Sequence, residues 1–401
     1  MTTHERTEDP AGETAGTHPA DGGAAGQPPL VHGTVAPGFE PLREAFAAVL
    51  GAEPGHAAQL AAYLDGRQVA DLWGGPGMSG DSLLGVFSST KGVTFLVLAL
   101  LAQQGTLDLD REVRAYWPEF AAEGKGGLTV RELAGHRAGA IGVAEGFTLA
   151  ELAEDAALAA RLAPHRPYWR PGAAFGYHSL TIGALVGEVV RRAGGASLRA
   201  VYREALAEPY GIDLYLGLPP GEAPRVLDVL PPVPAPADPA PAAPDSLGGI
   251  AANAHHPETV ELSALPNRPE IRAGGQGSVA ALASARGLAR LYAAAMSGLG
   301  GRPALLSPAM LAECAQPYSV GHDLTLGTHR AYGLGFMVGF PYLGAGAFGH
   351  DGAGGSAAFA DPRSGLAFGY TRRRFPTPAG AGPEAETLAR VARACALAAR
   401  S

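Results

Sequence analysis

The chain has few lysines and few cysteines. It carries two lysines against 28 arginines, and two cysteines, Cys314 and Cys395, in 401 residues. Two cysteines exclude a disulfide framework and a metal site built from several thiolates. The sequence has no H-E-x-x-H motif, and the pair His255 and His256 has no third ligand at helical spacing. We therefore expect neither a metal nor a cofactor.

Long apolar runs and clustered basic charge are also missing. The apolar segment that ends at Gly105 is too short to span a bilayer. Residues 1–34 lack an apolar run, which predicts a disordered tail, no signal peptide and a cytoplasmic protein. The formal charge is −8, and the one short basic run, residues 372–374, resembles a solvated strand end. We expect a small-molecule acyl substrate and neither nucleic acid nor membrane as partner; the oligomeric state stays open.

The pattern of apolar residues and turns predicts an α+β fold. Strands at both ends of the chain bracket a helical middle, so we expect a central antiparallel sheet flanked by helices, an α/β sandwich, with an inserted all-helical lobe. The sheet lobe spans about 35–105 and 275–401, and the helical lobe about 106–274 with a proline-rich loop at 218–245 that cannot be regular structure. The expected elements are helices at 41–50, 90–104, 180–193, 284–296 and 384–399, and strands at 57–64, 67–73, 331–340, 346–351, 356–360 and 366–371.

Lys91 stands three residues after Ser88, just before the apolar helix. This spacing makes the two side chains neighbours on one face of the first helical turn. Free N–H groups and the positive end of the helix dipole favour an oxyanion there and disfavour a protonated lysine. Lysine can be desolvated into a base, whereas arginine stays protonated. The pair therefore predicts a serine nucleophile with a lysine base.

Two later segments carry further candidates. Tyr177 lies on a loop that opens a helix, where a phenol can relay a proton, and Ser179 is a candidate cap of that helix. Residues 349–356 are rich in glycine, which lets a ligand approach a strand edge closely. Taken singly, Tyr177 and His350 are more often packing residues. We interpret His136 and His178 as structural.

Lys125 lies in a glycine-rich segment, Glu123 to Gly127. A charged side chain between glycines is typical of an exposed loop. We therefore interpret Lys125 as a solvated loop charge.

Three motifs together resemble the serine β-lactamase and penicillin-binding-protein superfamily. They are Ser88-x-x-Lys91, Tyr177-x-Ser179 and His350-x-Gly352. The likeness runs from about residue 35 to the end of the chain and is greatest to the class C-like branch, which holds family VIII carboxylesterases and related acyltransferases. It also covers residues 69–75, 107–110, 116–120 and 133–139. A β-lactamase/transpeptidase-like fold is implied.

The resemblance also implies roles for individual residues. Ser88 is expected to be the acyl-accepting nucleophile, Lys91 the general base and Tyr177 a proton-transfer residue. The N–H groups of Ser88 and Ala353 are expected to form the oxyanion hole, and the substrate is expected to lie along His350, Gly352 and Ser179.

Two positions depart from the pattern of the β-lactamases. Ser179 stands where they usually have asparagine, and His350 where they have lysine. Both changes remove groups that hold the amide and carboxylate of a β-lactam, so they favour an esterase. The leading hypothesis is a serine hydrolase that cleaves an ester, or an amide, through an acyl-enzyme. The alternatives are acyl transfer to an amine or alcohol and, with less support, a β-lactamase, a D-Ala-D-Ala carboxypeptidase or a non-catalytic ligand-binding homologue.

Overall fold

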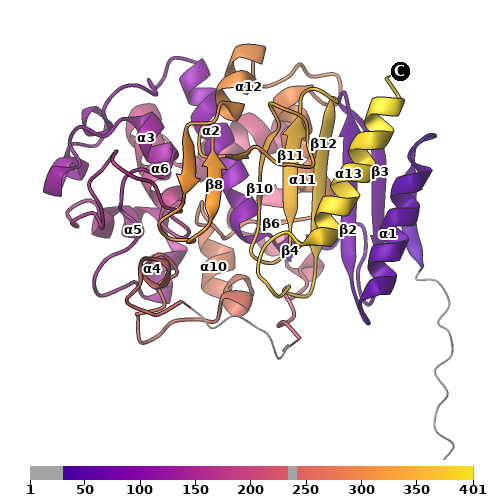
Figure 1. Cartoon of the computed structure of the whole chain (residues 1–401), viewed down its shortest axis with the longest axis horizontal. Helices are drawn as coiled ribbons and strands as arrows, with labels where there is room; N and C mark the ends of the chain where they lie inside the picture. The colour runs from indigo at the N-terminus through magenta and orange to yellow at the C-terminus, as the bar shows by residue number, and fades with distance from the viewer. Residues whose placement is uncertain (1–29, 234–241, 401) are drawn as a thin grey trace, which may run out of the picture.

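A nine-stranded antiparallel sheet forms the centre of the larger lobe in the computed structural model, which describes residues 30–233 and 242–400 (Figure 1). Its strand order is β1-β3-β2-β12-β11-β10-β9-β8-β7. The strands are β1 (Val31–Val35), β2 (Ala58–Leu64), β3 (Arg67–Gly74), β7 (Ser319–His322), β8 (His329–Tyr332), β9 (Met337–Val338), β10 (Phe348–Asp351), β11 (Ala357–Asp361) and β12 (Leu366–Arg372). Strands from both chain ends therefore meet in one sheet, at the pairing of β2 with β12.

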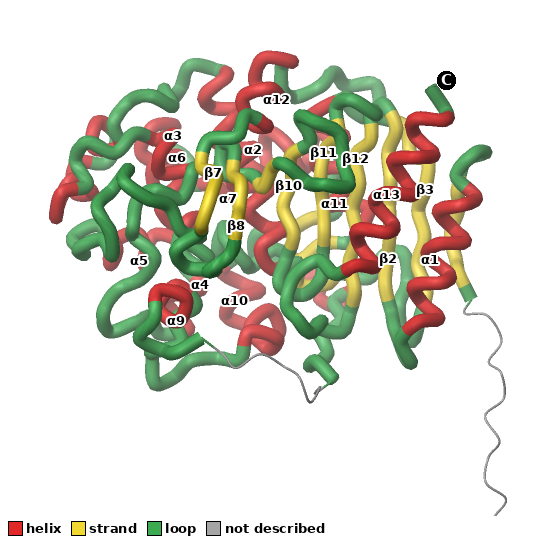
Figure 2. Tube along the Cα trace, in the orientation of Figure 1, coloured by secondary structure: helices red, strands yellow, loops and turns green. Residues whose placement is uncertain are grey.

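Helices cover both faces of this sheet. On one face α1 (Glu40–Ala52) and α13 (Pro383–Ala398) lie side by side, as Figure 2 shows in red in front of the yellow strands. The other face packs against α11 (Ala285–Met296). Side chains along β2 point alternately to the two faces of the sheet. Leu60 packs in the core with α1 and α13, whereas Ala61 and Tyr63 pack in the core that includes α11. The expected layered sheet lobe is confirmed.

The inserted lobe is helical, as expected, and packs on α2 (Lys91–Gln103). Its helices are α3 (Val130–Ala134), α4 (Leu149–Ala153), α5 (Asp155–Leu162), α6 (Ile182–Gly194), α7 (Leu198–Tyr202), α8 (Glu208–Tyr210), α9 (Leu247–Ala251) and α10 (Pro269–Gly274). Short 3-10 or π turns are η1 (Phe87–Thr90), η2 (Val113–Ala115), η3 (Pro118–Gly124), η4 (Arg203–Ala207), η5 (Pro220–Arg225) and η6 (Leu262–Asn267). A small sheet of β4 (Leu84–Gly85), β6 (Leu282–Ala283) and β5 (Leu214–Tyr215) and the helix α12 (Pro308–Ala315) complete the fold.

The hairpin between β2 and β3 follows the sequence prediction closely. Asp65 and Gly66 both have positive φ, at 47° and 78°. This is the backbone that a two-residue turn with right-handed strand twist requires, and Asp-Gly adopts it readily. Across residues 30–233 and 242–400, the longest apolar helices fall short of what a membrane crossing needs.

The structure differs in part from two of the sequence predictions. Strand β1 overlaps the end of the tail predicted at 1–34. Local composition does not reveal this strand, because it depends on pairing with β3, whose residues follow 35 to 43 positions later. Residues 1–29 of that tail lie outside the described part. The proline-rich stretch 218–245 contains the turn η5, and its Val226 and Leu230 make single β-bridges. Residues 234–241 of that stretch also lie outside the described part.

Two charges that the sequence placed in solvent are buried. Arg372 is 8% exposed and pairs with Glu53 and Glu384, which lie on different segments of the chain. Lys125 is 1% exposed, and its ammonium donates to the carbonyls of Ala122 and His165. Burial lowers the pKa of Lys125 to about 8. Both interpretations as solvated charges are therefore wrong.

Candidate active site

Ser88 lies at the junction between the lobes, in the turn η1 that leads into α2. The sequence placed it in the first turn of the helix itself; the structure adds one 3-10 turn before that helix. Phe87, which precedes it, has a positive φ of 48°. A bulky residue rarely adopts this conformation, and such backbone strain is typical of functional sites. The turn brings Ser88 to the wall of a cavity of about 310 Å³.

Lys91 is fully buried beside Ser88. Its Nζ lies 3.0 Å from Ser88 Oγ, 2.7 Å from the carbonyl oxygen of Ser179 and 3.0 Å from that of Ser278. Desolvation lowers the pKa of Lys91 well below its ordinary value, and the charge of Asp351 opposes this in part. The structure therefore brings the two residues of the predicted pair into contact and favours the uncharged amine.

Tyr177 lies next to Lys91 and lines the cavity together with Ser88. Lys91 Nζ is 4.7 Å from the centre of the Tyr177 ring, and the phenol oxygen is 3.5 Å from Nε2 of His350. The peptide N–H of Tyr177 donates to both carboxylate oxygens of Asp323, at 3.0 and 3.1 Å, which fixes the loop. Burial raises the pKa of the phenol, and a hydrogen bond with Ser88 lowers it by less. Tyr177 therefore keeps its proton at neutral pH.

The glycine-rich segment brings β10 against η1. Ser89 Oγ donates to the carbonyl of His350 at 3.3 Å. Gly352 permits this approach, since a Cβ there would overlap the Val86 carbonyl and the Ser356 hydroxyl. Ala353 follows in the turn closed by the Gly355 N–H donating to the Gly352 carbonyl, and it lines the cavity with Ser88.

His350 is buried and uncharged. Burial, and to a smaller extent the charge that Lys91 carries when protonated, lower its pKa to about 3. Its Nδ1 is 2.7 Å from the carbonyl oxygen of Asp351, so Nδ1 donates and Nε2 faces Tyr177 as an acceptor. A neutral imidazole replaces the charge that a lysine would supply here.

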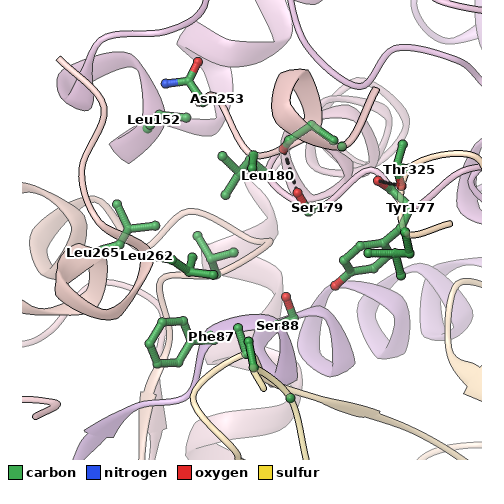
Figure 3. Close-up of a pocket in the computed structure, with 18 of the residues that line it drawn as sticks. Phe87, Ser88, Leu152, Tyr177, Ser179, Leu180, Asn253, Leu262, Leu265 and Thr325 are labelled. Carbon is green, nitrogen blue, oxygen red and sulfur yellow. Dashed lines mark hydrogen bonds between the residues drawn. The ribbon is translucent and has the colours of Figure 1, made fainter. Parts of the chain in front are cut away.

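Ser179 is not the cap of α6. That helix begins at Ile182 with Thr181 as its cap residue. The hydroxyl of Ser179 instead donates to the carbonyl of Ala251 at 2.6 Å (Figure 3). The carbonyl of Ser179 accepts from Lys91. The contact with α9 therefore replaces the helix-capping hydrogen bond that the sequence predicted for this side chain. Ser179 therefore lines the cavity with its donor already in use.

His136 and His178 pack behind Tyr177 as buried rings. The ring of His136 lies 5.2 Å from that of Tyr177 and 5.6 Å from that of His178. Burial lowers the pKa of both histidines, that of His178 to about 4. They do not line the cavity around Ser88, which agrees with their interpretation as structural residues.

Sequence reasoning missed four contributors to the site, which are two carbonyl groups, Asp323 and Arg330. The carbonyl of Ser278 and that of Ser179 hold Lys91, and carbonyl groups leave no trace in a sequence because every residue has one. Asp323 anchors the Tyr177 loop from a segment 146 residues away. Arg330 lines the cavity from β8. For the region around Arg330 the sequence predicted a strand at 331–340 but no residue of the site.

Both the sequence and the structure of this chain are similar to those of known proteins. The chain is 42% identical to EstA from Arthrobacter nitroguajacolicus over 92% of this chain and all of that one, with a TM-score of 0.87. A family VIII carboxylesterase is 32% identical over 91% of this chain and all of that one, with a TM-score of 0.83. The esterase/beta-lactamase LipL of Mycobacterium tuberculosis is 33% identical over 89% of this chain and 86% of its own length. The family model for beta-lactamase matches residues 42–393, and the chain belongs to this family of serine hydrolases.

Proposed function

We propose that this protein is a serine esterase that works through an acyl-enzyme on Ser88. The observation that carries the proposal is the environment of Lys91. An uncharged amine has two N–H donors and one lone pair. Two of the three oxygens around Nζ are carbonyls, which only accept, so both N–H groups are used by Ser179 and Ser278. The lone pair is then left for the hydroxyl of Ser88.

Acylation follows from this arrangement. Lys91 takes the proton of Ser88, whose Oγ attacks the ester carbonyl carbon. The N–H groups of Ser88 and Ala353 stabilise the resulting oxyanion. When the carbon–oxygen bond to the alcohol breaks, Tyr177 gives its proton to the departing oxygen and is reprotonated from Lys91. Water then attacks the Ser88 ester by the same steps in reverse.

His350 and Ser179 support an ester over a β-lactam as substrate. The positive charge that holds a β-lactam carboxylate in relatives is replaced by a neutral imidazole. The hydroxyl of Ser179 is occupied by Ala251. The similar family VIII carboxylesterase supports this choice, whereas LipL is named as both an esterase and a beta-lactamase.

The proposal is tested with Ser88→Ala and a short-chain aryl ester. We expect turnover to fall by roughly 10⁴-fold or more, as on removal of the nucleophile in other acyl-enzyme hydrolases. A fluorophosphonate probe should add its mass to the wild type and not to this variant. Ser297→Ala is the matched control, because that serine lies outside the cavity, and it should keep both properties. Full esterase turnover in Ser88→Ala would overturn the proposal.

Acyl transfer shares every step up to the acyl-enzyme. It is separated from hydrolysis by adding amine and alcohol acceptors to the same assay and measuring how the acyl group partitions. Free acid as the sole product across a broad acceptor panel supports hydrolysis.

A further inference from the structure

Arg330 lies in the wall of the candidate active-site cavity. Its Nε is buried and has no hydrogen-bond partner, and its guanidinium forms no ion pair within residues 30–233 and 242–400. Most other buried or half-buried arginines of the chain have acidic partners, as Arg372 does with Glu53. Leaving a guanidinium unpaired in a partly buried position costs free energy, so it calls for an explanation.

The charge of Arg330 acts on the catalytic groups. Burial is the main cause of the pKa shifts of Tyr177, His350 and Asp351, and the charge of Arg330 contributes to each of them. The guanidinium is therefore within electrostatic reach of the Tyr177 side of the cavity. Strand β8 fixes it there, since Arg330 is paired with Gly321 of β7.

The cavity has two chemically different sides around Ser88. In Figure 3, Phe87, Leu262 and Leu265 lie on one side of Ser88, and Tyr177 and Thr325 lie on the other. The first side is apolar and suits an acyl chain. On the second side Tyr177 faces the departing oxygen in the proposed mechanism. The alcohol part of an ester would therefore lie beside Tyr177, toward Arg330.

Two carboxylates near Arg330, those of Asp323 and Asp351, limit the charge of the ligand that this side of the cavity can bind. Asp323 already accepts hydrogen bonds from Tyr177, Thr325 and the hydroxyl of Tyr332, so its oxygens are in use. Asp351 accepts from the N–H of Ala381 and also lines the cavity. Its negative charge disfavours a dianion such as a phosphate monoester. A single carboxylate matches the fork of a guanidinium and adds one charge only.

We propose that Arg330 binds a carboxylate on the alcohol part of the ester substrate. The inference rests on the proposed esterase function and adds a substrate class to it.

The test compares two butyrate esters that differ in one charge, phenyl butyrate and 4-(butanoyloxy)benzoate. The measured quantity is the ratio of their kcat/KM values in the wild type, Arg330→Gln and Arg330→Lys. We expect the wild type to prefer the carboxylate ester. Arg330→Gln should lower the ratio about tenfold or more, mainly through KM for the charged ester, as expected for loss of a charged hydrogen bond. Arg330→Lys, which keeps the charge and loses the fork, should fall between the two.

The controls separate this inference from the esterase function. Arg302→Gln removes an exposed arginine outside the cavity and should leave the ratio unchanged. A wild type that hydrolyses both esters with no preference, or an Arg330→Gln variant with an unchanged ratio, overturns the role of Arg330 and leaves the esterase function standing. A wild type that hydrolyses neither ester overturns both.

Discussion

Nζ of Lys91 lies 3.0 Å from Oγ of Ser88, and both N–H groups that an uncharged Lys91 would carry are directed by carbonyls elsewhere. The lone pair of an uncharged Lys91 therefore points at the Ser88 hydroxyl, which favours proton transfer from Ser88 to Lys91. Desolvation keeps the amine uncharged, since no carboxylate contacts Nζ to balance a positive charge in the described part of the chain. A lysine held in this way is a base without a separate activating group.

The first prediction concerns the pH dependence of kcat/KM. In the proposed mechanism Lys91 is inactive when protonated, and its pKa in the folded protein is lowered, so activity should be lost as pH falls through that lowered pKa. With rising pH, kcat/KM for a neutral ester should increase through one ionisation and level off well below pH 10. A curve that keeps rising up to the ordinary pKa of lysine would contradict the uncharged amine.

Lys91→Arg tests the same group by substitution. A guanidinium does not deprotonate, so kcat/KM should fall by roughly 10²- to 10⁴-fold. Lys125→Arg is the matched control, because Lys125 is the only other lysine and does not line the cavity. Melting temperatures of both variants show whether each folds. Equal losses of activity in two folded variants would argue against a special role of Lys91.

Tyr177→Phe should lower kcat more than it changes KM. The variant keeps the ring, which stacks on Tyr332 at 6.0 Å, and the backbone contacts with Asp323. It removes only the proton that the mechanism gives to the leaving alcohol, so kcat should fall about 10²-fold or more for an ester with a poor leaving group. An ester of an acidic phenol needs less protonation and should be affected less.

Equal effects of Tyr177→Phe on good and poor leaving groups would show that the phenol acts by packing. The comparison uses two acetate esters, one of 4-nitrophenol and one of an alkyl alcohol. Because both substrates are assayed on the same variant, a general loss of folded protein cancels from their ratio.

The parts of the site differ in how far the sequence reveals them. Ser88 and Lys91 are three residues apart, so local helical spacing predicts their contact. Tyr177 and His350 are 173 residues apart, and only resemblance to a family predicted that they meet. The carbonyl of Ser278 and the free guanidinium of Arg330 could not be predicted, because what matters is the tertiary position of a common group. More of the fold could be predicted from the sequence, because the hairpin at Asp65 and Gly66 and the apolar helix after Lys91 both depend on neighbouring residues in the chain.

The clearest errors of the sequence predictions concern the burial of charged residues, and Arg372 shows the reason. In the sequence it begins a run of three arginines, which is typical of a solvated strand end. In the structure its Nη1 donates to Glu384 at 2.8 Å and its Nη2 to Glu53 at 2.6 Å. Glu53 precedes it by 319 residues. Burial of a charge depends on such distant partners, so local composition cannot predict it.

Arg372→Met should therefore destabilise the protein. The substitution keeps much of the buried side-chain volume and leaves two carboxylates, Glu53 and Glu384, without their shared partner. Breaking a buried pair by removing one side costs about 3 kcal/mol, and the partial exposure of both glutamates reduces the expected loss to about 2 kcal/mol of unfolding free energy. Urea denaturation measures it as a lower midpoint with an unchanged slope. Arg373→Met is the matched control, since within the described chain the Arg373 side chain forms no ion pair and donates a hydrogen bond only to the carbonyl of Asp228. If both variants unfold at the same midpoint, the cluster around Arg372 does not hold the strand end β12 against α13, and the burial of this arginine would need another explanation.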